Sequence, residues 1–213
     1  MRESGDLVES ERLIRAVLAA RRKQLGDKHF LVSFTMDQLG IVLRLSGRPA
    51  DAVIQHQLAQ TMREGVAGMP PQELAAAHVH LALSDLGIGN LPQAHEQIGI
   101  ALRLLNDMKP VNPERIADAL IAQSHIAFAQ HDMPIVCAAA DKALILRPPD
   151  DPATGWRHAD ALAAHGECLA ARKDYAAART ELQAALAMLQ RSRGTNHWMT
   201  VQVRDAIHAL PSA

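Results

Sequence analysis

Every 42 residues, this chain of 213 residues interrupts a helical pattern with a pair of residues that end helices. The pairs are Gly5-Asp6, Gly47-Arg48, Gly89-Asn90, His131-Asp132 and Lys173-Asp174. Small residues keep the same frame, because Gly40, Ala82, Ser124 and Gly166 each lie seven residues before one of these pairs. Self-similarity at one fixed period is typical of repeat proteins, in which each unit packs on its neighbours to complete a core. The spacing therefore predicts a solenoid of similar units.

The segments between the pairs carry helical sequence. Apolar residues such as Leu39, Val42 and Leu43 follow the i, i+3, i+4 spacing of one helix face. The chain contains 38 alanines and 26 leucines, which are strong helix formers, and only six aromatic residues. Strands favour the β-branched and aromatic residues that are scarce here. Together these features predict an all-α fold and argue against an all-β protein or a parallel-sheet enzyme.

Prolines divide each repeat into two helices. Pro49, Pro92 and Pro134 follow the breaking pairs, in the first helical turn where a missing backbone N–H costs nothing. Further prolines precede the next repeat, so each repeat is predicted to be two antiparallel helices joined by a tight turn. We predict one solenoid over residues 1–213, with a half repeat at 6–25, helix pairs at 30–65, 71–107, 113–147 and 155–192, and a C-terminal capping helix at 197–210.

The pattern resembles the tetratricopeptide repeat. In that family a small residue, a turn and two alanines let neighbouring helices pack closely, and Gly40, Gly47, Ala52 and Ala59 stand at the corresponding positions of this frame. The 42-residue period and a recurring linker are similar to the kinesin-light-chain-like branch. The linker reads Leu25-Gly26-Asp27-Lys28-His29-Phe30 and returns as Gly194-Thr195-Asn196-His197-Trp198. The resemblance covers almost the whole chain and implies a right-handed α-solenoid of about ten helices.

This sequence departs from the family pattern in two places. The paired asparagines that the branch carries on its first helices are replaced by Asp37-Gln38 and then by apolar residues. His131 stands where the other repeats have a turn glycine or lysine, in the most degraded of the repeats.

Charge and hydropathy exclude several classes of partner. A formal net charge of −1, from 22 Lys and Arg against 23 Asp and Glu, gives no field to attract a nucleic-acid backbone. The longest uncharged run near the middle, 119–131, is too short and too polar to span a bilayer. Charges begin at Arg2, so no signal-peptide core follows Met1. We therefore expect no nucleic acid, no membrane and a cytoplasmic location, while the opening half repeat also suits a domain cut from a longer protein.

No catalytic or cofactor-binding motif stands out. The chain has no G-x-S-x-G, phosphate-binding loop, C-x-x-C or H-E-x-x-H motif, so we expect neither enzymatic activity nor a cofactor. His78 and His80 are two residues apart and point to different faces of a helix. His158, His165 and Cys168 share one face and could hold zinc if a neighbouring helix gave a fourth ligand. Ordinary solenoid positions are the preferred interpretation, and we predict no metal site.

The two cysteines, Cys137 and Cys168, lie on helices that are predicted to pack together. A disulfide between them is geometrically conceivable and would permit a redox switch, but sequence spacing cannot establish it. Buried free cysteines that act as small apolar residues are far more common. Two free thiols are therefore the preferred interpretation.

The family resemblance also indicates where a partner would bind. Its members usually hold ligands in a concave groove lined by the first helices, at fixed positions around the small residue. In this chain those positions are Asp37, Ile41, Arg44, Val79, Leu83, Leu86, Ile121, His125, Phe128 and Glu167. The Lys/Asn/Arg clamp with which chaperone-tail-binding members hold a terminal carboxylate is not matched. The predicted groove is apolar in its middle and charged at both ends, which suits an extended apolar segment or an amphipathic helix.

The alternative for this set is that some of its residues belong to the core between repeats. Burial and groove exposure share one helical periodicity, so the sequence alone leaves both assignments open.

These observations favour a non-catalytic protein-interaction module, acting as a scaffold or as a regulatory domain of a larger protein. A groove with few convergent polar groups suits a protein segment better than a small polar ligand. The alternative is a domain that senses a peptide or small ligand and regulates an attached effector domain. Self-association through the end caps, giving a homo-oligomer, is a further possibility.

Overall fold

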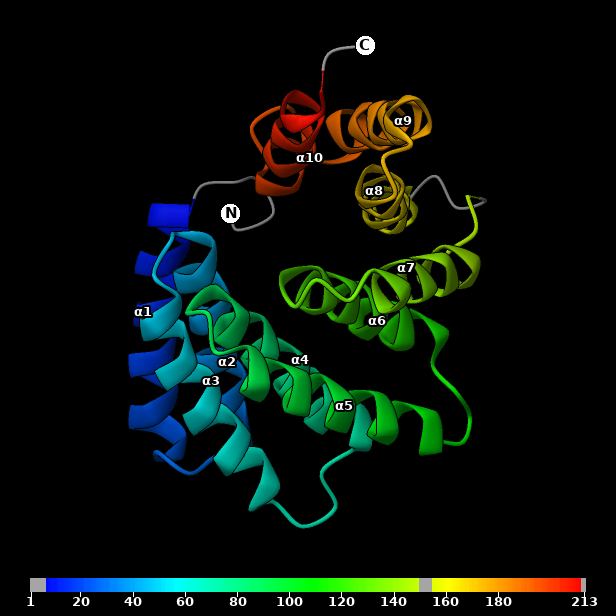
Figure 1. Cartoon of the computed structure of the whole chain (residues 1–213). Coiled ribbons are helices and arrows are strands. Elements are labelled where there is room, and N and C mark those ends of the chain that lie inside the picture. The colour runs from blue at the N-terminus through cyan, green and yellow to red at the C-terminus, as the bar shows by residue number, and fades with distance from the viewer. Residues whose placement is uncertain (1–6, 150–154, 212–213) are drawn as a thin grey trace. The chain divides into compact units, whose positions relative to one another are not determined.

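A computed structural model describes residues 7–149 and 155–211 of the chain (Figure 1). Every regular element within these residues is an α-helix, which confirms the predicted all-α fold of about ten helices. The helices are α1 (Leu7–Leu25), α2 (Phe30–Leu45), α3 (Pro49–Glu64), α4 (Pro71–Gly87), α5 (Leu91–Asp107), α6 (Pro113–Ala129), α7 (Met133–Leu146), α8 (Gly155–Ala171), α9 (Tyr175–Arg193) and α10 (Trp198–Ala209).

The helices fall into two compact units, and the boundary lies between Arg115 and Ile116. The first unit is a stack of α1 to α5, in which each helix packs on the next one along the chain and α2 also contacts α4. Met36 and Leu39 of α2 share its core with Ala52 and Ala59 of α3. This unit therefore has the consecutive helix packing of an α-solenoid.

The second unit contains α6, from Ile116 onward, to α10. Consecutive helices from α7 to α10 pack on one another, and α10 also reaches α8. The Ser124 hydroxyl of α6 donates a 3.0 Å hydrogen bond to the Val136 carbonyl of α7. Leu182 and Leu189 of α9 form the centre of a core shared with α8 and α10. Helices α7 to α10 of the second unit thus also pack consecutively.

The first residue of each described breaking pair has a left-handed backbone conformation. The φ angle is 75° at Gly47, 77° at Gly89, 60° at His131 and 66° at Lys173. In all four turns the next residue donates its N–H to the carbonyl five residues before it, at 2.9 Å, as in a Schellman ending. The 42-residue period of the sequence is therefore also a period of backbone geometry.

Small residues allow the two helices of a repeat to approach closely. A Cβ atom added to Gly40 would lie 2.6 Å from the His56 ring, and one added to Gly166 would lie 2.9 Å from Leu182. Four alanines twelve residues after the turns are fully buried: Ala59, Ala101, Ala143 and Ala185. Larger side chains at these places would force the helices apart.

Candidate functional site

The ten residues of the predicted groove lie on α2, α4, α6 and α8, and burial separates them into classes. Asp37, Val79 and Ile121 are buried. Phe128 is exposed, and the other six are half-buried: Ile41, Arg44, Leu83, Leu86, His125 and Glu167. Val79 and Ile121 thus have the burial of core residues. For these two positions this agrees with the alternative that some members of the set belong to the core between repeats. The remaining residues form two sets, one in each unit.

In the first unit, Leu83 and Leu86 lie one turn apart on α4 and remain half-exposed. Leu81, Ala82 and Ser84 of the same helix are buried, and α4 packs on α2, α3 and α5. Leu83 and Leu86 therefore form a half-buried apolar edge of α4.

Arg44 of α2 differs from the other members of this set. Its side chain makes no ion pair or hydrogen bond with any described residue, and its Nε atom is buried without a partner. Burial lowers the pKa of the Arg44 guanidinium to about 10. A partly buried cation without an acceptor is costly to the fold. It can donate hydrogen bonds to an acceptor that a partner supplies.

In the second unit, α6 and α8 bring two residues of the predicted set together. Nε2 of His125 lies 3.5 Å from Oε2 of Glu167. Phe128, one turn further along α6, is 51% exposed and is the most exposed member of the ten. An aromatic ring therefore lies one helical turn from a polar pair on the first helices of this unit.

Asp37 is the centre of a buried polar cluster. Nδ1 of His56 and Nδ1 of His80 each lie 2.9 Å from one of its carboxylate oxygens, and Nη2 of Arg63 lies 3.2 Å from Oδ2. Burial alone would raise the pKa of Asp37, but His80, His56 and Arg63 hold it well below its usual range. Burial lowers the pKa of His56, and Asp37 opposes this effect. The cluster joins α2, α3 and α4.

Sequence reasoning placed Asp37 in the groove and missed this cluster. The three partners lie 19, 26 and 43 residues from Asp37, so no spacing on a single helix connects them. A partial signal was present in the repeat frame, which places arginine at positions 21, 63 and 147. Each of these arginines donates a hydrogen bond to the backbone carbonyl ten residues further on, at 3.1, 3.2 and 3.5 Å respectively.

Arg147 is the centre of a corresponding cluster in the second unit. Its buried guanidinium pairs with Asp118 of α6 and, at 3.2 Å, with Asp160 of α8. Burial raises the pKa of Asp160, and the charge of Arg147 opposes this effect. Because Arg147 directly follows α7, its side chain connects α6, α7 and α8.

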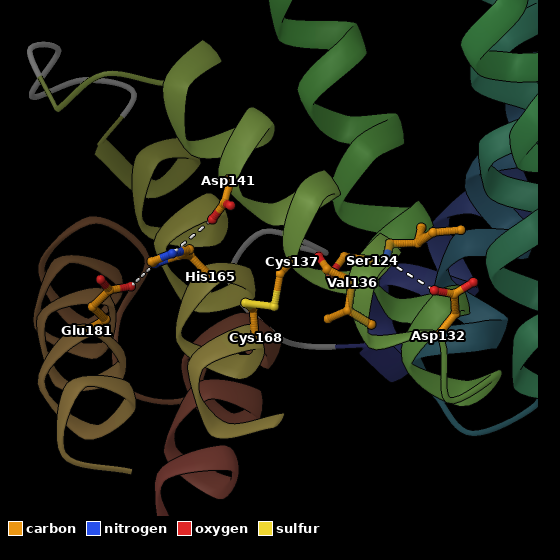
Figure 2. The surroundings of a disulfide bond; sticks show 9 residues. Ser124, Asp132, Val136, Cys137, Asp141, His165, Cys168 and Glu181 are labelled. Carbon is orange, nitrogen blue, oxygen red and sulfur yellow. Dashed lines mark hydrogen bonds and ion pairs between the residues drawn. A yellow bond between two sulfur atoms is a disulfide. The ribbon is translucent and has the colours of Figure 1, made fainter. Parts of the chain in front are cut away.

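The prediction of two free thiols is wrong. Cys137 of α7 and Cys168 of α8 form a disulfide with a Cα–Cα distance of 5.1 Å, within the usual range (Figure 2). Both residues are buried. The sequence could not decide this point, because 31 residues separate the cysteines and pairing depends on how two side chains face each other.

The zinc trio considered from the sequence is not assembled. Cys168 is bonded to Cys137, while His165 lies between Glu181, at 2.5 Å from Nδ1, and Asp141, at 3.0 Å from Nε2 (Figure 2). Nδ1 of His158 lies 2.6 Å from the carbonyl oxygen of Arg147. Each of the three side chains therefore has a different partner.

Comparisons with known proteins agree with this architecture. Residues 1–65 match the family model for the tetratricopeptide repeat. The crystal structure of BtubC (BKLC) from P. vanneervenii, a kinesin-light-chain-like tetratricopeptide-repeat protein, has a similar fold with a TM-score of 0.61. That likeness covers 100% of this chain and 93% of the other at 13% sequence identity. The resemblance inferred from the repeat frame is thus confirmed, and such repeats generally mediate protein–protein interactions.

A comparison with curated proteins gave no match. Among the helices in the described part of the chain, none combines the length and apolar character needed to cross a membrane.

Proposed function

We propose that this chain is a non-catalytic protein-interaction module that binds an extended or helical segment of a partner along its first helices. It would act as a scaffold or as a regulatory domain of a larger protein. The observation that carries the proposal is Phe128 on α6 of the second unit, an aromatic side chain that is 51% exposed. In the first unit, Leu83 and Leu86 on α4 add two half-buried apolar side chains. An exposed aromatic side chain on a first helix, where members of this repeat class usually hold ligands, favours a docking role.

Burial of apolar surface is the expected source of affinity. Leu83, Leu86 and Phe128 offer side chains that exclude water when a partner covers them, so binding is expected to depend weakly on salt. Arg44 adds a directional contact, because its unpaired guanidinium favours a partner that brings a carboxylate to α2. Polar contacts of this kind favour one partner and one orientation over others.

The arrangement of polar groups supports a non-catalytic role. Asp37 uses both carboxylate oxygens to bind His56, His80 and Arg63, and Arg147 is committed to Asp118 and Asp160. Groups that satisfy one another across helices hold a fold together, whereas a catalytic acid or base must be free to reach a substrate.

The first test compares Leu83→Glu with Ile54→Glu in affinity capture from an extract of the source cells, followed by measurement with the purified partner. Ile54 on α3 is 56% exposed and lies on a second helix, so it controls for an added charge on an apolar site. Leu83→Glu should weaken binding by at least about 10-fold, and Ile54→Glu should leave it unchanged.

The second test makes the same comparison in the other unit. Phe128→Ala should weaken capture, whereas Ile145→Ala, at a 78% exposed position of α7, should not. Thermal melts accompany all four variants. A Leu83→Glu protein that unfolds would place Leu83 in the core. A folded Leu83→Glu and Phe128→Ala double variant with undiminished binding would place the partner elsewhere.

A further inference from the structure

We propose that Asp37, His56 and His80 form a binding site for one first-row divalent transition-metal ion, of the class of Zn²⁺ and Co²⁺. One potential ligand atom from each of the three side chains lies within 4.8 Å of the others. The residues belong to α2, α3 and α4, which pack on one another in the first unit (Figure 1). The site includes none of Leu83, Leu86 and Phe128, the apolar residues of the proposed partner surface, and an ion there would link three helices of two successive repeats.

The spacing of the donor atoms is close to what such an ion requires. Each Nδ1 atom lies 2.9 Å from a carboxylate oxygen of Asp37. With metal–ligand bonds of about 2.0–2.1 Å in tetrahedral geometry, two ligand atoms stand ~3.3 Å apart. The His56 hydrogen bond ends on Oδ1 of Asp37 and the His80 hydrogen bond on Oδ2, so one ion would replace both by binding between the three side chains. The three ligand atoms, which lie within 4.8 Å of one another, would move to the spacing that tetrahedral coordination requires.

The donor set selects the class of metal. Two imidazoles and one carboxylate match zinc and other first-row transition ions, whereas Ca²⁺ and Mg²⁺ prefer oxygen ligands. Three protein ligands leave a coordination position for water. The His80 side chain is 24% exposed, so solvent and ions can reach this side of the cluster, while Asp37 and His56 stay buried.

His56 can change its tautomer without breaking a second hydrogen bond. Its Nε2 atom is buried and has no hydrogen-bond partner, so a proton that moves from Nδ1 to Nε2 frees the Nδ1 lone pair for a metal but leaves the Nε2–H without an acceptor, a cost that metal binding must offset. The imidazole stays neutral in both tautomers, and the close packing of its ring on Gly40 keeps the side chain in place.

Arg63 influences the site in two opposite ways. Its Nη2 atom, 3.2 Å from Oδ2, orients the Asp37 carboxylate in the way that outer partners of metal ligands do. Its positive charge, together with that of the nearby Arg44, weakens the attraction for any cation. Only an ion that gains strongly from imidazole coordination would bind, which again favours transition metals.

The test is a titration of the untagged, chelator-treated full chain with Co²⁺, followed by visible absorption, and then with Zn²⁺. We expect one Co²⁺ per chain with a d–d absorption band, displacement of Co²⁺ by Zn²⁺, and a rise in melting temperature with either ion. His80→Gln should weaken binding by at least about 10-fold, whereas His80→Cys, which keeps a ligand atom, should still bind Zn²⁺.

His165→Gln is the matched control, because His165 is also half-exposed and contacts two carboxylates, yet lies in the second unit. It should bind Co²⁺ as the unchanged chain does. The metal-free melting temperature of each variant shows whether it folds. The proposal is overturned if the chain binds no Co²⁺ up to about 1 mM. Equal binding by folded His80→Gln, or loss of the site in His165→Gln, would overturn it too.

Discussion

Two arginines of the first unit, Arg63 and Arg44, are expected to affect the stability of the fold in opposite ways because their surroundings differ. Arg63 is buried, pairs with Asp37, donates to the Glu73 carbonyl and stacks on Phe34 at 4.3 Å. Arg44 is partly buried and has no partner among the described residues. The first arginine stabilises the fold through its contacts. The second imposes the cost of a desolvated charge that only a binding partner would offset.

Methionine at these two positions should therefore have opposite effects on stability. Arg44→Met keeps the length of the side chain and removes the unpaired charge, so the free energy of unfolding should rise by about 1 kcal/mol. Arg63→Met leaves the buried Asp37 carboxylate without its cation. This change should lower the free energy of unfolding by about 3–5 kcal/mol. Urea denaturation at neutral pH measures both. A loss of stability in Arg44→Met would show that Arg44 has a stabilising contact in the folded protein.

At the scale of secondary-structure elements, the helix pairs depend on a turn that recurs every 42 residues. Glycine adopts the left-handed conformation of this turn without steric cost, and Gly47 and Gly89 supply it in two repeats. His131 and Lys173 adopt the same conformation with a Cβ atom, which costs about 1–2 kcal/mol per residue. The turn geometry is therefore maintained by the helices that flank it.

Lys173→Gly should stabilise the protein by about 0.5–1 kcal/mol, because glycine relieves the strain but adds entropy to the unfolded chain. The reverse change, Gly47→Lys, should destabilise it by a similar amount. No atom lies within 4 Å of a Cβ placed at Gly47, so that change tests the backbone alone. Denaturation midpoints with an unchanged m-value measure both effects. Equal stability of Lys173→Gly and the parent chain would mean that the turn carries no strain.

At the scale of the whole molecule, the chain contains two compact units with separate cores. The disulfide lies within the second unit, between α7 and α8. Both tryptophans of the chain, Trp156 and Trp198, belong to that unit as well. Tryptophan fluorescence therefore reports on the second unit, while far-UV circular dichroism reports on the helices of both.

Reduction of the disulfide should lower the stability of the second unit. The two cysteines are separated by 31 residues, and removing a cross-link over such a loop costs about 3–4 kcal/mol in the loop-entropy model. After reduction in denaturant and refolding with reductant, the denaturation midpoint measured by tryptophan fluorescence should fall. The part of the circular-dichroism transition that comes from the first unit should keep its midpoint. Cys137→Ser/Cys168→Ser should show the lower midpoint with and without reductant. A fluorescence midpoint that does not respond to reduction would contradict the bond.

The backbone was more predictable from the sequence than the polar contacts. Turn residues and small residues act locally, so the frame that contains Gly47, Gly89 and Ala101 indicated helices, turns and close packing. The Asp37 cluster depends on side chains from three helices, and no short spacing reveals it. The sequence also did not predict that Val79 is buried while Leu83 is half-buried. These two residues are four positions apart and share a helix face, so their burial depends on which neighbouring helix covers each of them.

The Cys137–Cys168 bond also determines how the chain would respond to a pulling force applied at its two ends. Because the bond joins residues 31 positions apart, tension would pass from α7 to α8 through the sulfur atoms and bypass the chain between them. The fully stretched protein would be shorter by on the order of 100 Å while the bond is intact. The segment between the cysteines would carry no load, so the last turns of α7 and the first turns of α8 would be shielded from mechanical unfolding.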